Sequence, residues 1–225
     1  HINVLKDAGF LEATVGVDKL LVTATGLAAG RITRGANALW LGSALLPLPL
    51  GKDVAGAFDL GAAELAALVA AMTSEAPGGV VWGDAADVPA DSLPALLGRP
   101  MAWLCEERWR LAELQWSHGV EQPLPLGLDQ LVLVFQWASG QEWERVSAEA
   151  RMRGFADGDL FRLLRRTLEV LQGLQTSVED LELTAASSDQ WHRRVVDAVE
   201  LCSRSPLTDN LALEDGEAEL VLMGV

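Results

Sequence analysis

The spacing of leucines between Asp157 and Gln175 restricts this part of the chain to an amphipathic helix. Apolar residues recur three and four positions apart, as one face of an α-helix requires: Leu160, Leu163, Leu164, Leu168 and Leu171. The sequence therefore predicts a helix from about Asp159 to Gln175 that buries these leucines in a core. Asp157 or Asp159 can cap its first turn.

The side of this helix that faces away from the leucines is basic. Arg162, Arg166 and Glu169 share one stripe and Arg165 lies beside it, because residues three and four apart are neighbours on a helix surface. Six of the fourteen arginines lie between Arg145 and Arg166, where only three acidic residues occur. Guanidinium groups on a rigid helix suit phosphates and planar ligands. The alternative interpretation is a solvated face that happens to be basic.

The composition favours helices over sheets. Half of the 225 residues are hydrophobic, Ala and Leu are prominent, and tyrosine is absent. We therefore expect a mainly α fold, a multi-helix bundle, in which most of the eight tryptophans lie in the core. A formal net charge of −15 argues against broad nucleic-acid binding by this chain alone. Any such contact must be local or shared with a more basic partner.

The rest of the chain reads as a succession of helices and connectors. A short helix ends near Gly9, and two extended segments around Gly9–Ala13 and Leu20–Thr23, joined by Val15–Asp18, predict the tail of a winged-helix module. Thr25 is expected to cap the next helix. Further helices are predicted at 26–33, 38–46, 61–72, 101–117, 128–138, 142–152 and 189–203, with a loop at 76–91. Pro-Leu-Pro-Leu-Gly occurs at Pro47–Gly51 and Pro123–Gly127, and both copies are expected to be extended connectors.

The sequence contains no motif that favours catalysis or metal binding. Cys105 and Cys202 match no metal spacing and are expected to be buried, reduced thiols. Gly51-Lys52-Asp53 lacks the upstream glycine and the Ser or Thr of a phosphate-binding loop. No apolar run is long enough for a membrane span. We expect a cytoplasmic domain taken from a larger protein, with no catalytic residues and no metal ligands; an unrecognised hydrolase is the alternative on the enzyme side.

Three runs stand out along the chain: Trp137 to Trp143, Asp157 to Arg162 and Leu164 to Glu169. Supporting runs are Val22 to Ala29, Leu60 to Glu75, and Ser205-Pro206 with Asp209 to Leu211. Together these runs resemble the C-terminal helical domain, often called DSHCT, of the Ski/Mtr-type (superkiller and antiviral) DExH-box RNA helicases. Their order along the chain is that of the family. The net acidity, the length of the 76–91 loop and residues 212–225 depart from the family pattern.

The resemblance implies a domain organisation and a role. Residues 1–28 would be the end of a winged helix, 29–211 the helical domain and 212–225 a C-terminal extension. In this family the helical domain packs on two RecA-like ATPase domains, which hold ATP and Mg, and places one ratchet-like helix along the RNA. That helix would be residues 159–175 here, and the fragment would have no ATPase activity of its own.

The same resemblance implies the residues that contact single-stranded RNA. Arg166 and Glu169 are the candidates to face bases, and Arg162 and Arg165 to face phosphates or interdomain carboxylates. The sequence thus predicts an RNA-processing accessory domain whose partners are RNA and the parent's ATPase domains. The alternative is a helical protein-interaction module with no direct nucleic-acid contact, which the tryptophan content and the acidity favour.

Overall fold

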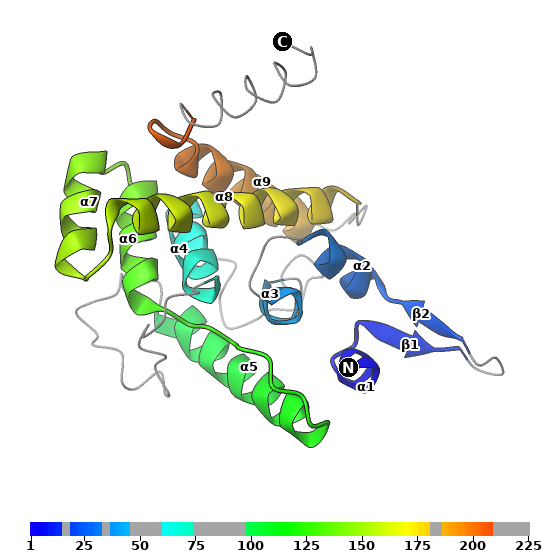
Figure 1. Ribbon diagram of the computed structural model, residues 1–225. Coiled ribbons are helices and arrows are strands. Elements are labelled where there is room, and N and C mark those ends of the chain that lie inside the picture. Colours follow the sequence, from blue (N-terminus) through cyan, green and yellow to red (C-terminus); the bar gives the residue numbers. More distant parts are fainter. Residues whose placement is uncertain (15–18, 33–36, 46–59, 74–97, 181–185, 209–225) are drawn as a thin grey trace, which may run out of the picture.

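Helices make up most of the part of the chain that the structure describes, which is residues 1–14, 19–32, 37–45, 60–73, 98–180 and 186–208 of a computed structural model (Figure 1). The elements in chain order are α1 (Ile2–Asp7), β1 (Leu11–Ala13), β2 (Leu20–Val22), α2 (Ala24–Arg31), α3 (Ala38–Leu45), α4 (Ala62–Met72), α5 (Gly98–Ser117), α6 (Leu128–Ala138), α7 (Trp143–Met152), α8 (Asp157–Asp180) and α9 (Ala186–Cys202). The predicted mainly α bundle is confirmed.

Some predictions fall outside the described residues. They are the loop Val15–Asp18, the first Pro-Leu-Pro-Leu-Gly copy at Pro47–Gly51, the Gly51-Lys52-Asp53 run, the 76–91 loop and the extension at 212–225.

The centre of the bundle is α4, which is short and rich in alanine. Every residue from Leu65 to Met72 is buried. This burial follows because α6, α8 and α9 all pack against α4. Figure 1 shows α8 running across α4 and α9. Alanine side chains allow these helices to approach closely, so burial extends around the whole helix.

The N-terminal segment forms a helix followed by a two-stranded hairpin. β1 and β2 are antiparallel, with Leu11 opposite Val22 and Ala13 opposite Leu20. The predicted cap at Thr25 is wrong, because Thr23 is the N-cap of α2 and its hydroxyl oxygen accepts from the Gly26 N–H at 3.0 Å. The hydroxyl also donates to the Gly9 carbonyl at 2.8 Å, which fixes the hairpin to α2. A winged-helix origin for this segment stays a prediction.

The second Pro-Leu-Pro-Leu-Gly copy connects α5 to α6 without helix, as predicted. Its carbonyl oxygens accept hydrogen bonds from three side chains: Asn37 Nδ2 to Pro123 at 3.0 Å, Arg108 Nε to Leu124 at 2.8 Å, and Trp40 Nε1 to Pro125 at 2.9 Å. The segment pairs with no strand among the described residues, so side chains of Asn37, α3 and α5 satisfy its carbonyl oxygens. The connector is thereby held along α5.

The described helices include none with the length and hydropathy that crossing a membrane requires.

Candidate nucleic-acid interface

The helix α8 begins with an acidic cap and buries the leucine face that the sequence predicted. Asp159 Oδ2 accepts from the Ala156 N–H at 3.0 Å, which satisfies a backbone donor at the helix entrance. All five predicted leucines are buried. The helix extends past the predicted end at Gln175 to Asp180, and Ser177 there donates to the Ala28 carbonyl at 2.9 Å. This contact to α2 explains the additional turn.

The four residues predicted to contact RNA lie on the outward side of α8, opposite the leucines. The side chain of Arg162 is 74% exposed, whereas those of Arg165 and Glu169 are 31% and 25% exposed. Arg166 is half-buried. Their spacing of three and four residues brings them onto one strip of the helix surface. The role of each in RNA binding remains a prediction.

Carboxylates on the same helix hold two of these arginines. Arg162 pairs with Asp159 at 2.5 Å and Arg165 with Glu169 at 3.3 Å. The hydrogen bond from Arg162 lowers the pKa of Asp159 below its ordinary value, so the pair is ionised at neutral pH. An exposed pair such as Arg162–Asp159 stabilises a fold by only about 0.2–1 kcal/mol. A phosphate can therefore displace the carboxylate from the Arg162 guanidinium at little cost, whereas Arg165 and Glu169 are partly buried.

The Arg166 side chain reaches the C-terminal end of α4. Its Nη1 donates to the Thr73 carbonyl oxygen at 3.5 Å. Thr73 is the C-cap of α4, where a helix presents carbonyls and partial negative charge. No local pattern indicates this contact, because the two residues are 93 positions apart. Arg166 therefore joins α8 to α4 while its side chain remains partly exposed.

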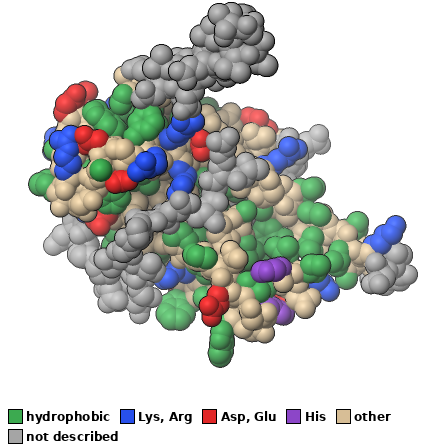
Figure 2. Space-filling model, viewed as in Figure 1, with side chains coloured by type: hydrophobic (Ala, Val, Ile, Leu, Met, Phe, Trp, Pro, Cys, Tyr) green, Lys and Arg blue, Asp and Glu red, His purple; other side chains and the backbone are tan. Residues whose placement is uncertain are grey.

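The neighbouring arginines fasten the turn between α7 and α8. Arg151 makes two hydrogen bonds to Asp157, of 2.9 and 2.6 Å, and Asp157 also accepts from Ser147 at 2.7 Å. Arg153 pairs with Asp129 at 2.5 Å and with Glu149 at 2.8 Å. Figure 2 shows Lys and Arg side chains over α7 and α8 with Asp and Glu side chains among them. The basic character of this face is therefore weaker than the count of arginines suggests.

Trp137, the first tryptophan of the Trp137–Trp143 run, is a core residue. Trp137 is 1% exposed and its Nε1 donates to the Cys202 carbonyl at 3.2 Å. The Trp143 ring meets it edge-on with 6.1 Å between centroids, and the Arg204 guanidinium lies 3.9 Å from the ring centre. Arg204 also donates to the carbonyls of Trp137 and Gln141. This cluster, which we call the Trp137 clasp (Trp137, Trp143, Cys202 and Arg204), joins the α6–α7 corner to the end of α9.

Both cysteines are buried and outside any disulfide, as the sequence predicted. Burial raises the pKa of the Cys202 thiol to about 12, opposed by the nearby charge of Arg204. Among the described residues, no group of three or more His, Cys, Asp or Glu side chains is arranged to hold a metal ion.

The Cys202 thiol is expected to make stability fall at high pH. Its folded pKa lies above the ordinary thiol value of 9.0, so its contribution is complete below about pH 9 and is lost as the pH rises toward about 12. The measurement is urea denaturation at several pH values, with the same series on Cys202→Ala. The comparison separates the effect of the thiol on stability from that of lysine titration. Alkaline curves that coincide for the two proteins would show that this thiol contributes nothing.

Comparison with known proteins finds a family model and a relative that are similar to this chain. The model of the DSHCT (NUC185) domain family matches residues 19–198. A protein of Arabidopsis thaliana named DExH-box ATP-dependent RNA helicase DExH15, chloroplastic, is 33% identical over 140 residues. The aligned segment is 61% of this chain and 11% of that helicase, so the chain spans only a small part of its relative.

Proposed function

The chain belongs to the DSHCT (NUC185) domain family, and on that premise we propose that it is an accessory domain of an ATP-dependent RNA helicase which contacts single-stranded RNA along α8. The proposal assigns ATP and Mg²⁺ to RecA-like ATPase domains of the parent protein, on which this domain packs. It also assigns the parent to the Ski/Mtr type of RNA-processing helicase and to the cytoplasm. The similarity to a DExH-box RNA helicase supports the helicase context.

The observation that carries the RNA contact is the outward strip of α8. Arg162 extends into solvent at one end, and Arg165, Arg166 and Glu169 follow within two helical turns. The buried leucines fix the helix in the bundle, so the backbone that carries the strip is in place before RNA binds. Arg162 and Arg165 exchange their carboxylates for phosphates, while Arg166 and Glu169 face bases. Affinity is modest unless the parent's other domains complete the channel.

The test replaces Arg162, Arg165 and Arg166 with alanine in the intact parent helicase. For single strands, each phosphate contact adds about 0.7 to the slope of log affinity against log salt. Loss of two contacts is therefore expected to lower that slope by about 1.4 and to weaken RNA-stimulated ATP hydrolysis. RNA affinity is measured by fluorescence anisotropy across a salt series.

The matched control removes the same charge elsewhere. Arg110, Arg145 and Arg193 are exposed on α5, α7 and α9, and their triple alanine variant is expected to keep the salt slope. Because Arg166 also bonds the Thr73 carbonyl, thermal unfolding of both variants is compared, and Arg162→Ala alone tests the most exposed contact. Equal slopes for the two triple variants would exclude a contact along α8.

A helical protein-interaction module is the second candidate. It is favoured by two tryptophans, Trp109 and Trp116, that are exposed on α5 instead of lying in the core. Under this alternative the α8 arginines serve as packing and ion-pair surface. RNA affinity would then be unchanged by the α8 substitutions, while binding of protein partners would persist.

A further inference from the structure

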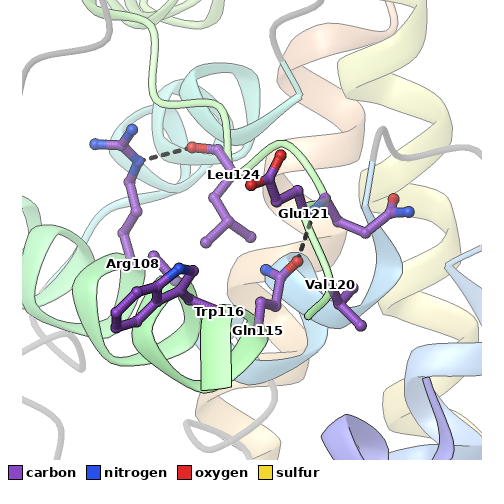
Figure 3. A pocket seen from close by; sticks show the side chains of 8 residues that line it. Arg108, Gln115, Trp116, Val120, Glu121 and Leu124 are labelled. Atoms are coloured by element: carbon purple, nitrogen blue, oxygen red, sulfur yellow. Dashed lines mark hydrogen bonds between the residues drawn. The ribbon is translucent and has the colours of Figure 1, made fainter. Parts of the chain in front are cut away.

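A pocket lies between the second half of α5 and the segment that follows it, away from the α8 strip. Its volume is about 240 Å³, and Figure 3 shows the side chains that form its walls. The residues that matter for its chemistry are Arg108, Gln115, Trp116, Val120, Glu121 and Leu124. This volume is below the ~300 Å³ at which small-molecule sites usually begin. The pocket suits one side chain and its peptide group better than a whole cofactor.

The walls are fixed before any ligand binds. Gln115 Oε1 accepts from the Gln122 N–H at 2.8 Å, and Arg108 Nε donates to the Leu124 carbonyl at 2.8 Å. The Val120 N–H donates to the Gln115 carbonyl at 2.9 Å. These bonds hold the segment against α5, so a ligand would bind without having to order the pocket first.

The floor of the pocket carries a buried donor that lacks an acceptor. Gln115 is 2% exposed, and its Nε2 finds no hydrogen-bond partner among the described residues. The bond from Gln122 to Oε1 fixes which end of the amide is nitrogen. Figure 3 shows that nitrogen on the side of Trp116 and Leu124. A buried, unsatisfied donor costs about 1–3 kcal/mol, which a ligand carbonyl would recover.

The rim of the pocket carries an exposed aromatic surface. Trp116, which lines the pocket, is 77% exposed. Figure 2 shows hydrophobic side chains standing out along the lower edge of the molecule, where α5 lies. Tryptophan dominates the binding energy of protein interfaces when a partner covers it. Together with Val120 and Leu124, the Trp116 indole therefore offers an apolar surface to a ligand side chain.

The charges around the pocket select against an oligonucleotide. Glu121 lines it and Glu113 is exposed one turn away on α5, while Arg110 is already paired with Glu107 at 2.6 Å. Arg108 is the one basic residue among those that line the pocket, and its Nε is bonded to the Leu124 carbonyl. A phosphate chain requires several available cations. A neutral or basic polypeptide matches both Glu121 and the formal charge of −15.

We propose that this pocket, between α5 and residues 120–124, binds an extended peptide segment of a protein partner. The segment places a backbone carbonyl against Gln115 Nε2, an aliphatic side chain on the Trp116 indole, and a Lys or Arg side chain beside Glu121. This site is separate from the α8 strip and does not depend on RNA binding there.

The test selects a displayed library of random peptides against the 225-residue chain. The expected consensus is an aliphatic residue with Lys or Arg close by. The best peptide is then titrated into ¹⁵N-labelled chain, and the side-chain amide of Gln115 and the indole N–H of Trp116 are expected to shift. Trp116→Ala is expected to weaken binding at least about tenfold. Because Trp116 is exposed, this variant is expected to fold normally.

Two further variants make the test specific. Trp109→Ala removes an exposed tryptophan of the same helix that does not line the pocket, and it is expected to leave affinity within about threefold. Glu121→Lys is expected to abolish the preference for basic peptides. The proposal is overturned if no peptide is enriched over the Trp116→Ala chain, if Trp109→Ala weakens binding equally, or if acidic peptides are enriched. Competition by a short single-stranded RNA for the same amide signals would also overturn it, in favour of a nucleobase site.

Discussion

Replacing Trp137 with alanine is expected to lower the free energy of unfolding by about 3–5 kcal/mol. The indole is buried at the Trp137 clasp, where it packs against Trp143 and under the Arg204 guanidinium. Its removal leaves a cavity and also leaves the Cys202 carbonyl without the indole donor. The corner between α6 and α7 would lose its main attachment to the end of α9.

Urea denaturation followed by far-ultraviolet circular dichroism measures the effect. Trp116→Ala is the matched control, because it removes the same ring from an exposed position on α5 and is expected to change the free energy of unfolding by less than about 0.5 kcal/mol. Trp137→Phe keeps an aromatic ring without the N–H donor and should fall between them. If the two alanine variants are equally stable, the clasp contributes no packing energy.

Gly26→Ala is expected to be strongly destabilising, by about 1–3 kcal/mol or more. A Cβ at this position would lie 2.3 Å from the Phe10 carbonyl oxygen and 2.9 Å from Val22 Cγ1. The Phe10 carbonyl cannot easily withdraw, because it accepts from the Thr23 N–H at 3.0 Å. The methyl group would therefore push the hairpin away from α2, although alanine itself favours a helix.

Gly30→Ala provides the control within the same helix. A Cβ at Gly30 meets nothing within 4 Å, so only the helix preference of alanine acts, and stability is expected to rise by up to about 1 kcal/mol. The two substitutions are chemically identical and should have opposite signs in thermal denaturation. A Gly26→Ala protein as stable as Gly30→Ala would mean that the hairpin moves freely on α2.

The parts of this fold that could be predicted are those that depend on local periodicity. The leucine face of α8 and the position of most helices follow from spacing within a few turns. The second Pro-Leu-Pro-Leu-Gly copy was also predictable as a connector, since proline excludes helix and ladder alike. The cap of α2 was misplaced by two residues because Thr23 and Thr25 offer the same hydroxyl, and only the contact with Gly9 distinguishes them.

The parts that could not be predicted depend on partners distant in sequence. Arg153 forms a salt bridge with Asp129, Arg166 donates to the Thr73 carbonyl, and Arg204 lies over the Trp137 ring. The sequence shows where the arginines are. It does not show which of them bind carboxylates or carbonyl oxygens within the fold. The pocket at Gln115 could not be predicted for the same reason. A single glutamine in a helix forms no sequence pattern, and the pocket exists only because the segment after α5 folds back over this residue.

The burial of α4 on every side has a mechanical consequence. The alanines of α4 allow close packing with α6, α8 and α9. A shift or rotation of α8 would therefore also disturb α6 and α9. The helix that carries the arginines is therefore expected to move together with α4, α6 and α9 as one body. In a helicase of the proposed kind, any stroke that advances the strand must come from motion of the motor domains against this domain.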